Sequence, residues 1–298
     1  MEAMEPFSFL PRDFALSGFM VMLLVGIACA LVFAVFRAKR AKADIRAVVV
    51  SGLAAVLSGI VGARGFSLLF EGGTTLVRNP PFFSFGNGDL SVWGGLLAGV
   101  PVGVLCLKLF RASPAKAVDL LAPPLALGLF LGRIGCLLTG CCWGAMASHS
   151  LSIGMLPPDE SWPMFLQWII FEENPEMWRR MVTDLGYPEN QIPCIPLYPV
   201  QAALAIAALA LLVLLLWIEK RRKGMAVRDG GQFGLFVFLF ALAYCVIGLW
   251  RADTLPVFLI RDMLAVNPGQ CAALAAMAIV LAVKIIARRS GNEPAAHF

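Results

Sequence analysis

The stretch YPVQAALAIAALALLVLLLWI, Tyr198–Ile218, contains no charged side chain and is apolar along almost its whole length. An α-helix needs about 20 apolar residues to cross the hydrocarbon core of a bilayer, and this stretch is long enough. Six other apolar blocks of similar length predict the spans Ala15–Phe36, Val48–Phe70, Val92–Leu107, Val118–Cys142, Phe233–Trp250 and Gln270–Ile286. The sequence therefore predicts an all-α polytopic membrane protein with about seven transmembrane helices.

The composition of the chain supports the same class. Of its 298 residues, 59% are hydrophobic and 14% are charged, whereas soluble domains carry about 25% charged residues. Much of the surface must therefore face something other than water. We expect the first span to be kept in the mature protein, because the residues before it are not the basic segment of a cleaved signal peptide.

Basic residues are distributed unevenly between the two sides of the predicted membrane protein. Sixteen of the 24 Lys and Arg residues fall in alternate connections, from Arg37–Arg46 to Lys284–Arg289, and six fall on the opposite side. Cytoplasmic loops carry the excess of Lys and Arg, so we expect the N-terminus outside and the C-terminus in the cytoplasm. Topology and attraction to anionic lipid explain the net charge of +5, and we expect no nucleic-acid partner.

We expect a single transmembrane domain over residues 1–298, with an extracytoplasmic insertion at 143–197. Within the insertion, Asn174-Pro175-Glu176 is typical of a helix start, with a cap, a proline at the first position and an early acid. A second short helix is predicted over Ser161–Phe171, whose aromatic residues suit the level of the lipid headgroups. This helical arm could anchor the insertion at the interface or gate the access of a substrate.

Three arginines are predicted at similar depth in the membrane. At 1.5 Å per residue, Arg64 and Arg133 lie about 24 and 22 Å from the inner edges of their spans, and Arg251 follows the sixth span. Ionisable groups inside a membrane are costly and mark functional sites. Because a guanidinium stays charged and matches phosphate oxygens, the cluster predicts a site for a lipid phosphate. The alternative is pairing with protein acids, namely Glu71, Asp89 or Asp253.

The segment around Arg133 is the most distinctive in the chain: LGLFLGRIGCLLTGCCWG, Leu127–Gly144. Gly128 and Gly132 form a small-xxx-small pair that lets membrane helices approach closely. The glycines that follow predict a helix that ends or breaks where the backbone comes near a ligand.

This segment resembles the signature of the bacterial prolipoprotein diacylglyceryl transferases, G-R-x-G-N-F-x-N-x-E-x-x-G, and matches it at Gly132, Arg133, Gly135 and Gly144. Other stretches resemble motifs of the same family in the same order, and the resemblance covers nearly the whole chain. They are Gly62-Ala63-Arg64 for G-G/A-R, Ser91–Leu97 for S-F-H-G-G-L-I, Asp119–Pro123 for the approach to the signature, Tyr198–Gln201 for H-P-S/T-Q, and Arg251–Asp253 for the end of R-x-P-D.

The resemblance implies a multi-pass enzyme of the bacterial cytoplasmic (inner) membrane that acts in lipoprotein biosynthesis. Enzymes of this family move a diacylglyceryl group from phosphatidylglycerol to the lipobox cysteine thiol of a prolipoprotein signal peptide, without a cofactor or metal. Fixed cations would stabilise the departing phosphate. The implied catalytic residues are Arg133, Cys141 and Tyr244. The implied substrate-binding residues are Arg64, Trp93, Gly94, Gly95, Tyr198, Gln201 and Arg251.

The chain departs from the family at residues with acid–base character. Trp93 stands where the family has a histidine, and a tryptophan cannot take a proton. The family's signature Asn, Asn and Glu correspond to Cys136, Thr139 and Cys141, and the Arg and Glu of its last motif to Tyr244 and Gly248. The phosphate-binding half of the site is therefore kept, and the acid–base half is changed.

Three cysteines near the outer end of the fourth predicted span, Cys136, Cys141 and Cys142, admit several interpretations. They could form a disulfide with one another or with Cys194, because that compartment is oxidising. They could bind a metal, although the spacing without a nearby His is weak for zinc. A thiolate beside Arg133 could be reactive, or the thiols could simply pack a tight helix end. The other four cysteines are expected to be small apolar residues within helices.

Two functions besides the transferase stay open. The first is a relative without turnover that binds anionic phospholipid at Arg64, Arg133 and Arg251. The second is a thiol-redox membrane protein that uses the cysteine cluster. A transferase with an altered acceptor is a variant of the leading hypothesis. The two histidines, His149 and His297, do not decide between these functions, because His149 is expected in a solvated loop.

Overall fold

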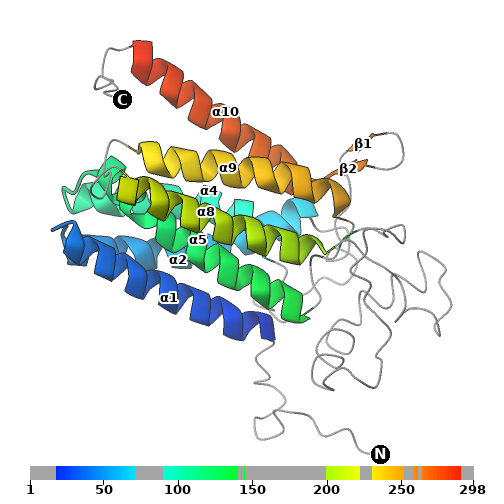
Figure 1. The fold of residues 1–298 in the computed structure, drawn as a ribbon, viewed down its shortest axis with the longest axis horizontal. Coiled ribbons are helices and arrows are strands. Elements are labelled where there is room, and N and C mark those ends of the chain that lie inside the picture. The colour runs from blue at the N-terminus through cyan, green and yellow to red at the C-terminus, as the bar shows by residue number, and fades with distance from the viewer. Residues whose placement is uncertain are drawn as a thin grey trace, which may run out of the picture.

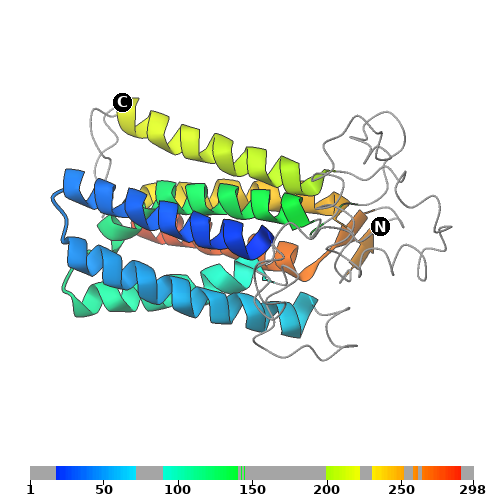
Figure 2. The same ribbon diagram turned by 90° about the horizontal axis from the view of Figure 1, so that it is seen from below.

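The computed structural model describes residues 18–71, 90–139, 142, 144, 199–221, 230–251, 258–260 and 264–289. Within these residues seven helices are long and apolar enough to cross a membrane, which confirms the predicted number of spans. They are α1 (Gly18–Arg40), α2 (Ile45–Phe66), α4 (Val92–Leu109), α5 (Pro114–Thr139), α8 (Val200–Arg221), α9 (Gly231–Ile247) and α10 (Pro268–Arg289). Figures 1 and 2 show the helices running along one long axis.

Three small elements extend this all-α architecture. A π-helical turn, η2 (Ser67–Glu71), continues α2, and a 3-10 turn, η5 (Gly248–Trp250), continues α9. Between η5 and α10 an antiparallel hairpin pairs β1 (Phe258–Ile260) with β2 (Leu264–Val266). The sequence patterns did not predict this hairpin, because apolar periodicity does not distinguish strands this short.

Some predicted helix ends were wrong by a few residues. Helix α1 continues to Arg40, beyond the predicted end at Phe36, because basic residues occupy its last turn. Helix α5 ends at Thr139, so Cys142 lies beyond the helix rather than inside it. Apart from Gly144, the predicted insertion at 143–197 lies outside the described residues, as do its two predicted helices.

Two tight turns connect neighbouring helices at one end of the bundle. After α1, Lys42 adopts a left-handed conformation (φ 52°) and Ala43 N donates to Ala38 O at 3.0 Å. After α4, Arg111 does the same (φ 54°) and Ala112 N donates to Leu107 O at 3.0 Å. Both bonds are of the kind that closes a helix C-terminus with a left-handed residue. Asp44 then caps α2 by accepting from the backbone N–H of Arg46 at 2.9 Å.

Glycines let α2 and α4 pack with their backbones almost in contact. A Cβ built on Gly94 would lie 2.4 Å from Gly62 O, and a Cβ on Gly62 would lie 2.6 Å from Gly94 O. Helices α1 and α5 approach in a similar way, since a Cβ on Gly26 would lie 3.4 Å from Gly128 O. Small residues at membrane helix interfaces permit this approach. The bundle therefore contains two close helix pairs, α2 with α4 and α1 with α5.

A buried polar network ties α1, α5, α8 and α9 together near these turns. Arg37 on α1 donates to both carboxylate oxygens of Glu219 on α8, with Nη1–Oε2 at 2.8 Å, and its Nε donates to Leu120 O on α5 at 2.7 Å. Gln232 on α9 donates to the same carboxylate at 2.9 Å. On α5, Asp119 accepts from the backbone N–H of Phe233 at 2.8 Å and so caps the start of α9.

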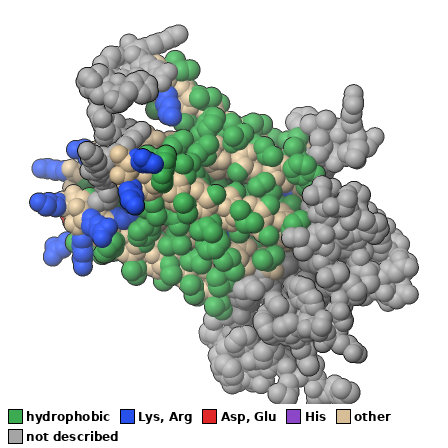
Figure 3. All heavy atoms as spheres, in the orientation of Figure 1, with side chains coloured by type: hydrophobic (Ala, Val, Ile, Leu, Met, Phe, Trp, Pro, Cys, Tyr) green, Lys and Arg blue, Asp and Glu red, His purple; other side chains and the backbone are tan. Residues whose placement is uncertain are grey.

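Lys and Arg side chains gather at this same end of the molecule, and hydrophobic side chains cover the flank of the bundle (Figure 3). Exposed apolar residues on the helices include Leu57, Ile206, Val213 and Ile286. A flank of this kind suits contact with lipid rather than water. We call the end with the exposed cations the basic end. Its assignment to the cytoplasm stays a prediction.

Candidate functional site

The predicted site arginines lie at the end of the bundle opposite the basic end. Arg64 on α2 and Arg133 on α5 each lie 19 residues beyond the first residue of their helix, about 28 Å at 1.5 Å per residue. Their side chains are 1% and 7% exposed. Arg251, which is 8% exposed, follows η5 at the same end. Asp89, Asp253 and the side chain of Glu71 lie outside the described part, so pairing with these acids stays an alternative.

Arg251 connects three segments of the chain. Its Nη1 donates to the Tyr244 hydroxyl at 2.7 Å, seven residues earlier on the α9–η5 segment. Its Nη2 donates to the Cys142 sulfur at 3.6 Å, and its backbone pairs with Gly144 in an isolated antiparallel bridge. The segment after α5 is thereby held against the end of α9. The helix of the Gly-rich signature segment ends at Thr139, and the segment after it lies beside a cation; that its backbone comes near a ligand stays a prediction.

Tyr244 lies between the two arginines. Its ring is 6.0 Å from the Arg133 guanidinium carbon, a cation–π distance, while its hydroxyl accepts from Arg251. Arg133 is also within electrostatic range of Arg251, Cys136 and Cys142. Two like charges thus share a buried region, which favours an anion between them because the anion would offset their repulsion.

Trp93 packs edge-on against Tyr244, with ring centroids 5.5 Å apart and an interplanar angle of 86°. It also contacts Phe240, at 5.8 Å between centroids. The indole is 2% exposed, and within the described residues its Nε1–H has no hydrogen-bond partner. A buried donor without a partner is costly unless a ligand or water completes it. Trp93 therefore offers a hydrogen bond beside the two arginines.

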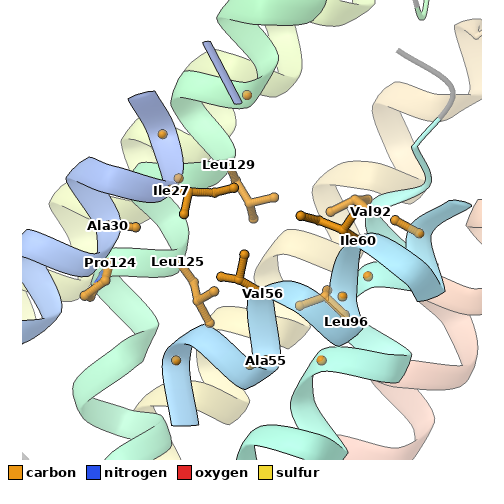
Figure 4. Close-up of a pocket in the computed structure, with 18 of the residues that line it drawn as sticks. Ile27, Ala30, Ala55, Val56, Ile60, Val92, Leu96, Pro124, Leu125 and Leu129 are labelled. Atoms are coloured by element: carbon orange, nitrogen blue, oxygen red, sulfur yellow. The ribbon is translucent and has the colours of Figure 1, made fainter. Parts of the chain in front are cut away.

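An apolar cavity of about 340 Å³ opens between the α1–α5 pair and the α2–α4 pair. Figure 4 shows Ile27 of α1 and Leu129 of α5 on one side and Val56 and Ile60 of α2 on the other. At the end away from the basic end, its lining includes Arg133, Cys136 and Cys142. Gly132 also lines it, and a Cβ built there would meet no atom within 4 Å. The cavity is therefore an apolar slot with a cation at one end.

The remaining predicted substrate-binding residues differ in what surrounds them. Gly94 packs against the α2 backbone at Gly62, and a Cβ on Gly95 would lie 3.5 Å from Gly59 O. Helix packing alone therefore explains why residue 94 is a glycine. Gln201 is buried in the first turn of α8. Tyr198 and Cys141 lie outside the described residues, so their predicted roles stay predictions.

Sequence comparison agrees with this geometry. The profile of the family described as prolipoprotein diacylglyceryl transferase matches residues 7–286. The chain belongs to this family. Phosphatidylglycerol–prolipoprotein diacylglyceryl transferase 2 of Clostridium perfringens is 27% identical over 200 residues, which cover 66% of this chain and 64% of that protein.

Two further relatives are matched over most of their length. Both are named phosphatidylglycerol–prolipoprotein diacylglyceryl transferase. The one from Clostridium tetani is 24% identical over 84% of this chain and 86% of its own length. The one from Pectobacterium atrosepticum is 26% identical over 83% of this chain and 81% of its own length. The family resemblance drawn from the motifs is therefore confirmed.

At one position where the chain departs from the family motif, another side chain fills the space. Gly248 corresponds to the motif's glutamate, and a Cβ on Gly248 would lie 3.1 Å from Gln270 Nε2. Gln270 Nε2 donates to Cys245 O at 2.8 Å, and its Oε1 accepts from Asn267 N at 2.8 Å. In return Asn267 Oδ1 accepts from Gln270 N at 2.9 Å. This reciprocal capping of α10 was not predicted, although Asn267-Pro268-x-Gln270 carries the sequence signal of a helix start.

The structure limits the interpretations of the cysteines. Cys136 and Cys142 form no disulfide, so a disulfide within the cluster would have to join Cys141 and Cys194, both outside the described residues. Among the described residues no group of three or more His, Cys, Asp or Glu side chains could hold a metal ion. Cys142 was predicted only as one member of the cluster. Its contact with Arg251 could not be read from the sequence, since 109 residues separate the two.

Proposed function

We propose that this protein transfers the diacylglyceryl group of phosphatidylglycerol to the lipobox cysteine thiol of a prolipoprotein signal peptide. The observation that carries the proposal is the position of two buried guanidinium groups, Arg133 and Arg251, around Tyr244. Arg133 also lines the end of the apolar cavity. A phospholipid has the matching shape, with an anionic phosphate joined to apolar chains.

The phosphate would lie between the guanidinium groups of Arg133 and Arg251. During transfer, the C–O bond between the glycerol carbon and the phosphate breaks, and negative charge accumulates on the phosphate oxygen. Fixed cations in a site of low dielectric stabilise that charge without having to reorganise. Tyr244 holds Arg251 in position through its hydroxyl, and the N–H of Trp93 can donate to a phosphate or ester oxygen.

The apolar cavity would hold an acyl chain of the donor. Along α5 its lining runs from Val118 to Cys136, about 27 Å at 1.5 Å per residue. One leaflet of the hydrocarbon core is about 15 Å thick, so an extended chain fits this length. Lipid tails are as apolar as the cavity wall, so close packing inside the cavity holds the chain and places the phosphate near Arg133.

The proposed setting is the cytoplasmic membrane of a bacterium, with the basic end in the cytoplasm. The arginines then face the outer leaflet, where a secreted precursor arrives. The insertion at 143–197 is proposed to lie on that side. A reporter active only in the cytoplasm should work when fused after Phe298 and fail when inserted near Glu189. The opposite pattern would reverse the proposed orientation.

A binder of anionic phospholipid without turnover is the second candidate. The chemistry of the described site favours it, because its ionisable residues include neither a carboxylate nor an imidazole. They are Arg64, Arg133, Arg251, Tyr244, Cys136 and Cys142. Such a set binds a phosphate but holds no ordinary general base.

The test uses purified protein, phosphatidylglycerol vesicles and a lipobox peptide, with peptide mass as the readout. The transferase predicts a mass gain equal to one diacylglyceryl group. Arg133→Lys keeps the charge but loses the planar fork, so both lipid binding and transfer should fall. The matched control is Arg46→Ala, an exposed arginine at the basic end. Lipid binding without any mass gain would favour the binder, and an unchanged Arg133→Ala variant would refute the phosphate site.

A further inference from the structure

The sulfur of Cys142 lies in a cationic environment that a neutral thiol would not require. Arg251 Nη2 donates to it at 3.6 Å, and Arg133 interacts with it electrostatically. The residue is 9% exposed and packs with Phe19 and Cys136. Water therefore screens these charges weakly, and their attraction to a negative sulfur is stronger than at a surface.

The groups around Cys142 come from three elements. Helix α5 contributes Arg133 and Cys136, the residue after η5 contributes the Arg251 guanidinium, and α1 contributes the apolar ring of Phe19. Among the described residues, the charged groups that act on the sulfur include Arg133 and Arg251. Two guanidinium groups favour the thiolate form of a cysteine over its neutral form.

The backbone also fixes this sulfur in place. Cys142 adopts a left-handed conformation (φ 58°), which is uncommon for a residue with a side chain. The bridge from Gly144 to Arg251 ties the segment to the end of α9. The sulfur is thereby held at the lining of the cavity that also includes Arg133.

We propose that Cys142, as a thiolate, accepts the proton of the lipobox thiol during the transfer reaction. This inference rests on the proposed function. It assigns to a cysteine the proton transfer that Trp93 cannot perform. A thiolate is a base whose pKa can lie near the operating pH, as general-base catalysis prefers. The arginines that keep Cys142 ionised also make it a weaker base than the lipobox thiolate, so the proton transfer is uphill until attack on carbon consumes that thiolate.

The proposed transfer begins with a proton transfer between two sulfur atoms. The proton of the lipobox S–H moves to the Cys142 sulfur and leaves a lipobox thiolate. That thiolate attacks the glycerol carbon next to the phosphate, an S–C bond forms, and the C–O bond breaks with its electron pair on the phosphate oxygen. Glycerol phosphate leaves from Arg133 and Arg251 with the added negative charge. Cys142 then releases its proton to the departing phosphate or to water, and the thiolate is restored.

The experiment measures transfer against pH for the full chain with phosphatidylglycerol and a lipobox peptide. Without Cys142 the reaction depends on spontaneous ionisation of the peptide thiol, whose ordinary pKa is about 8.5. Cys142→Ala should therefore be slower at neutral pH by about 30-fold, because about 3% of such a thiol is ionised at pH 7, and should recover as the pH rises past that pKa. Cys142→Ser should behave like Cys142→Ala, because a hydroxyl does not ionise in this range.

Two comparisons make the result specific. Cys106→Ala removes a thiol of α4 that does not line the cavity, and it should keep the wild-type rate and pH profile. In Cys142→Ala the transfer rate at neutral pH should fall much more than the affinity for phosphatidylglycerol, because the cysteine acts on the thiol proton. A Cys142→Ala profile parallel to wild type would overturn this proposal, as would a shifted profile in Cys136→Ala instead. Absence of transfer in the wild type at every pH would instead refute the proposed function.

Discussion

The amide of Gln270 lies over Gly248, so close that a Cβ on Gly248 would be 3.1 Å from Gln270 Nε2 and 3.3 Å from its Cγ and Cδ. Gln270 is held there by Cys245 O and by its reciprocal bonds with Asn267. A neutral amide from α10 therefore fills the space beside Gly248. The motif comparison aligns Gly248 with the family's glutamate, so under that alignment an amide lies where the family has an acid.

Gly248→Glu is therefore expected to destabilise the protein instead of restoring a family residue. Its side chain would have to displace Gln270 and break a buried bond to Cys245 O, and overpacking of this kind costs about 1–3 kcal/mol. The double variant Gly248→Glu/Gln270→Ala provides room and should regain most of the loss. Thermal unfolding in detergent measures both. A single variant as stable as wild type would show that Gln270 moves away at little cost.

The packing of α2 against α4 makes a second prediction about stability. Gly94→Ala places a methyl group 2.3 Å from Phe66 Cβ and 2.4 Å from Gly62 O, so the two helices must separate. We expect a loss of about 1–3 kcal/mol, seen as a lower melting temperature. Gly65→Ala is the control, because its Cβ would meet nothing within 4 Å. Alanine is the better helix former, so this variant should be as stable as wild type or slightly more stable.

The buried pair at the basic end makes a third prediction. Glu219→Ala leaves Arg37 charged and buried, and removing one partner of such a pair costs about 3–5 kcal/mol. Replacing both residues by Met should recover much of this loss, because no uncompensated charge remains. The exposed neighbour Lys220→Ala should stay within about 0.5 kcal/mol of wild type. If the double variant unfolds as easily as Glu219→Ala, hydrogen bonding to Leu120 O and Gln232 matters more than the charge.

The sequence predicted the parts of this structure that depend on local chemistry. Apolar length alone identified all seven spans, and the motif around Arg133 identified the family. Burial of Arg64 and Arg133 followed from their positions within apolar spans. The contacts that shape the site could not be predicted in the same way, since Arg251 and Cys142, or Gly248 and Gln270, meet only once the helices pack. Arg37 is an example. The charge pattern counted it among the basic residues that indicate topology, but in the structure it is buried and paired with Glu219, 182 residues away in the sequence.

The last prediction concerns the apolar cavity and uses Gly132. This residue lines the cavity next to Arg133, and a Cβ built on it would meet no atom within 4 Å. Gly132→Leu should therefore fold normally while its side chain occupies space that an acyl chain would use. Forcing an acyl chain and a leucine into the same space costs about 1–3 kcal/mol, as overpacking does, so the affinity for phosphatidylglycerol falls by about 5- to 150-fold.

A ligand without acyl chains separates this explanation from a general disturbance of Arg133. Glycerol phosphate, which carries the phosphate alone, should bind wild type and Gly132→Leu equally, whereas phosphatidylglycerol should discriminate between them. Gly65→Leu is the matched control, because residue 65 is also a helical glycine with open space around its Cβ but does not line the cavity. Binding of each ligand to the purified protein measures the two affinities, with melting temperature as the check on folding. A Gly132→Leu variant that binds phosphatidylglycerol as wild type does would place the acyl chain elsewhere, and an equal loss for both ligands would indicate a disturbed phosphate site instead.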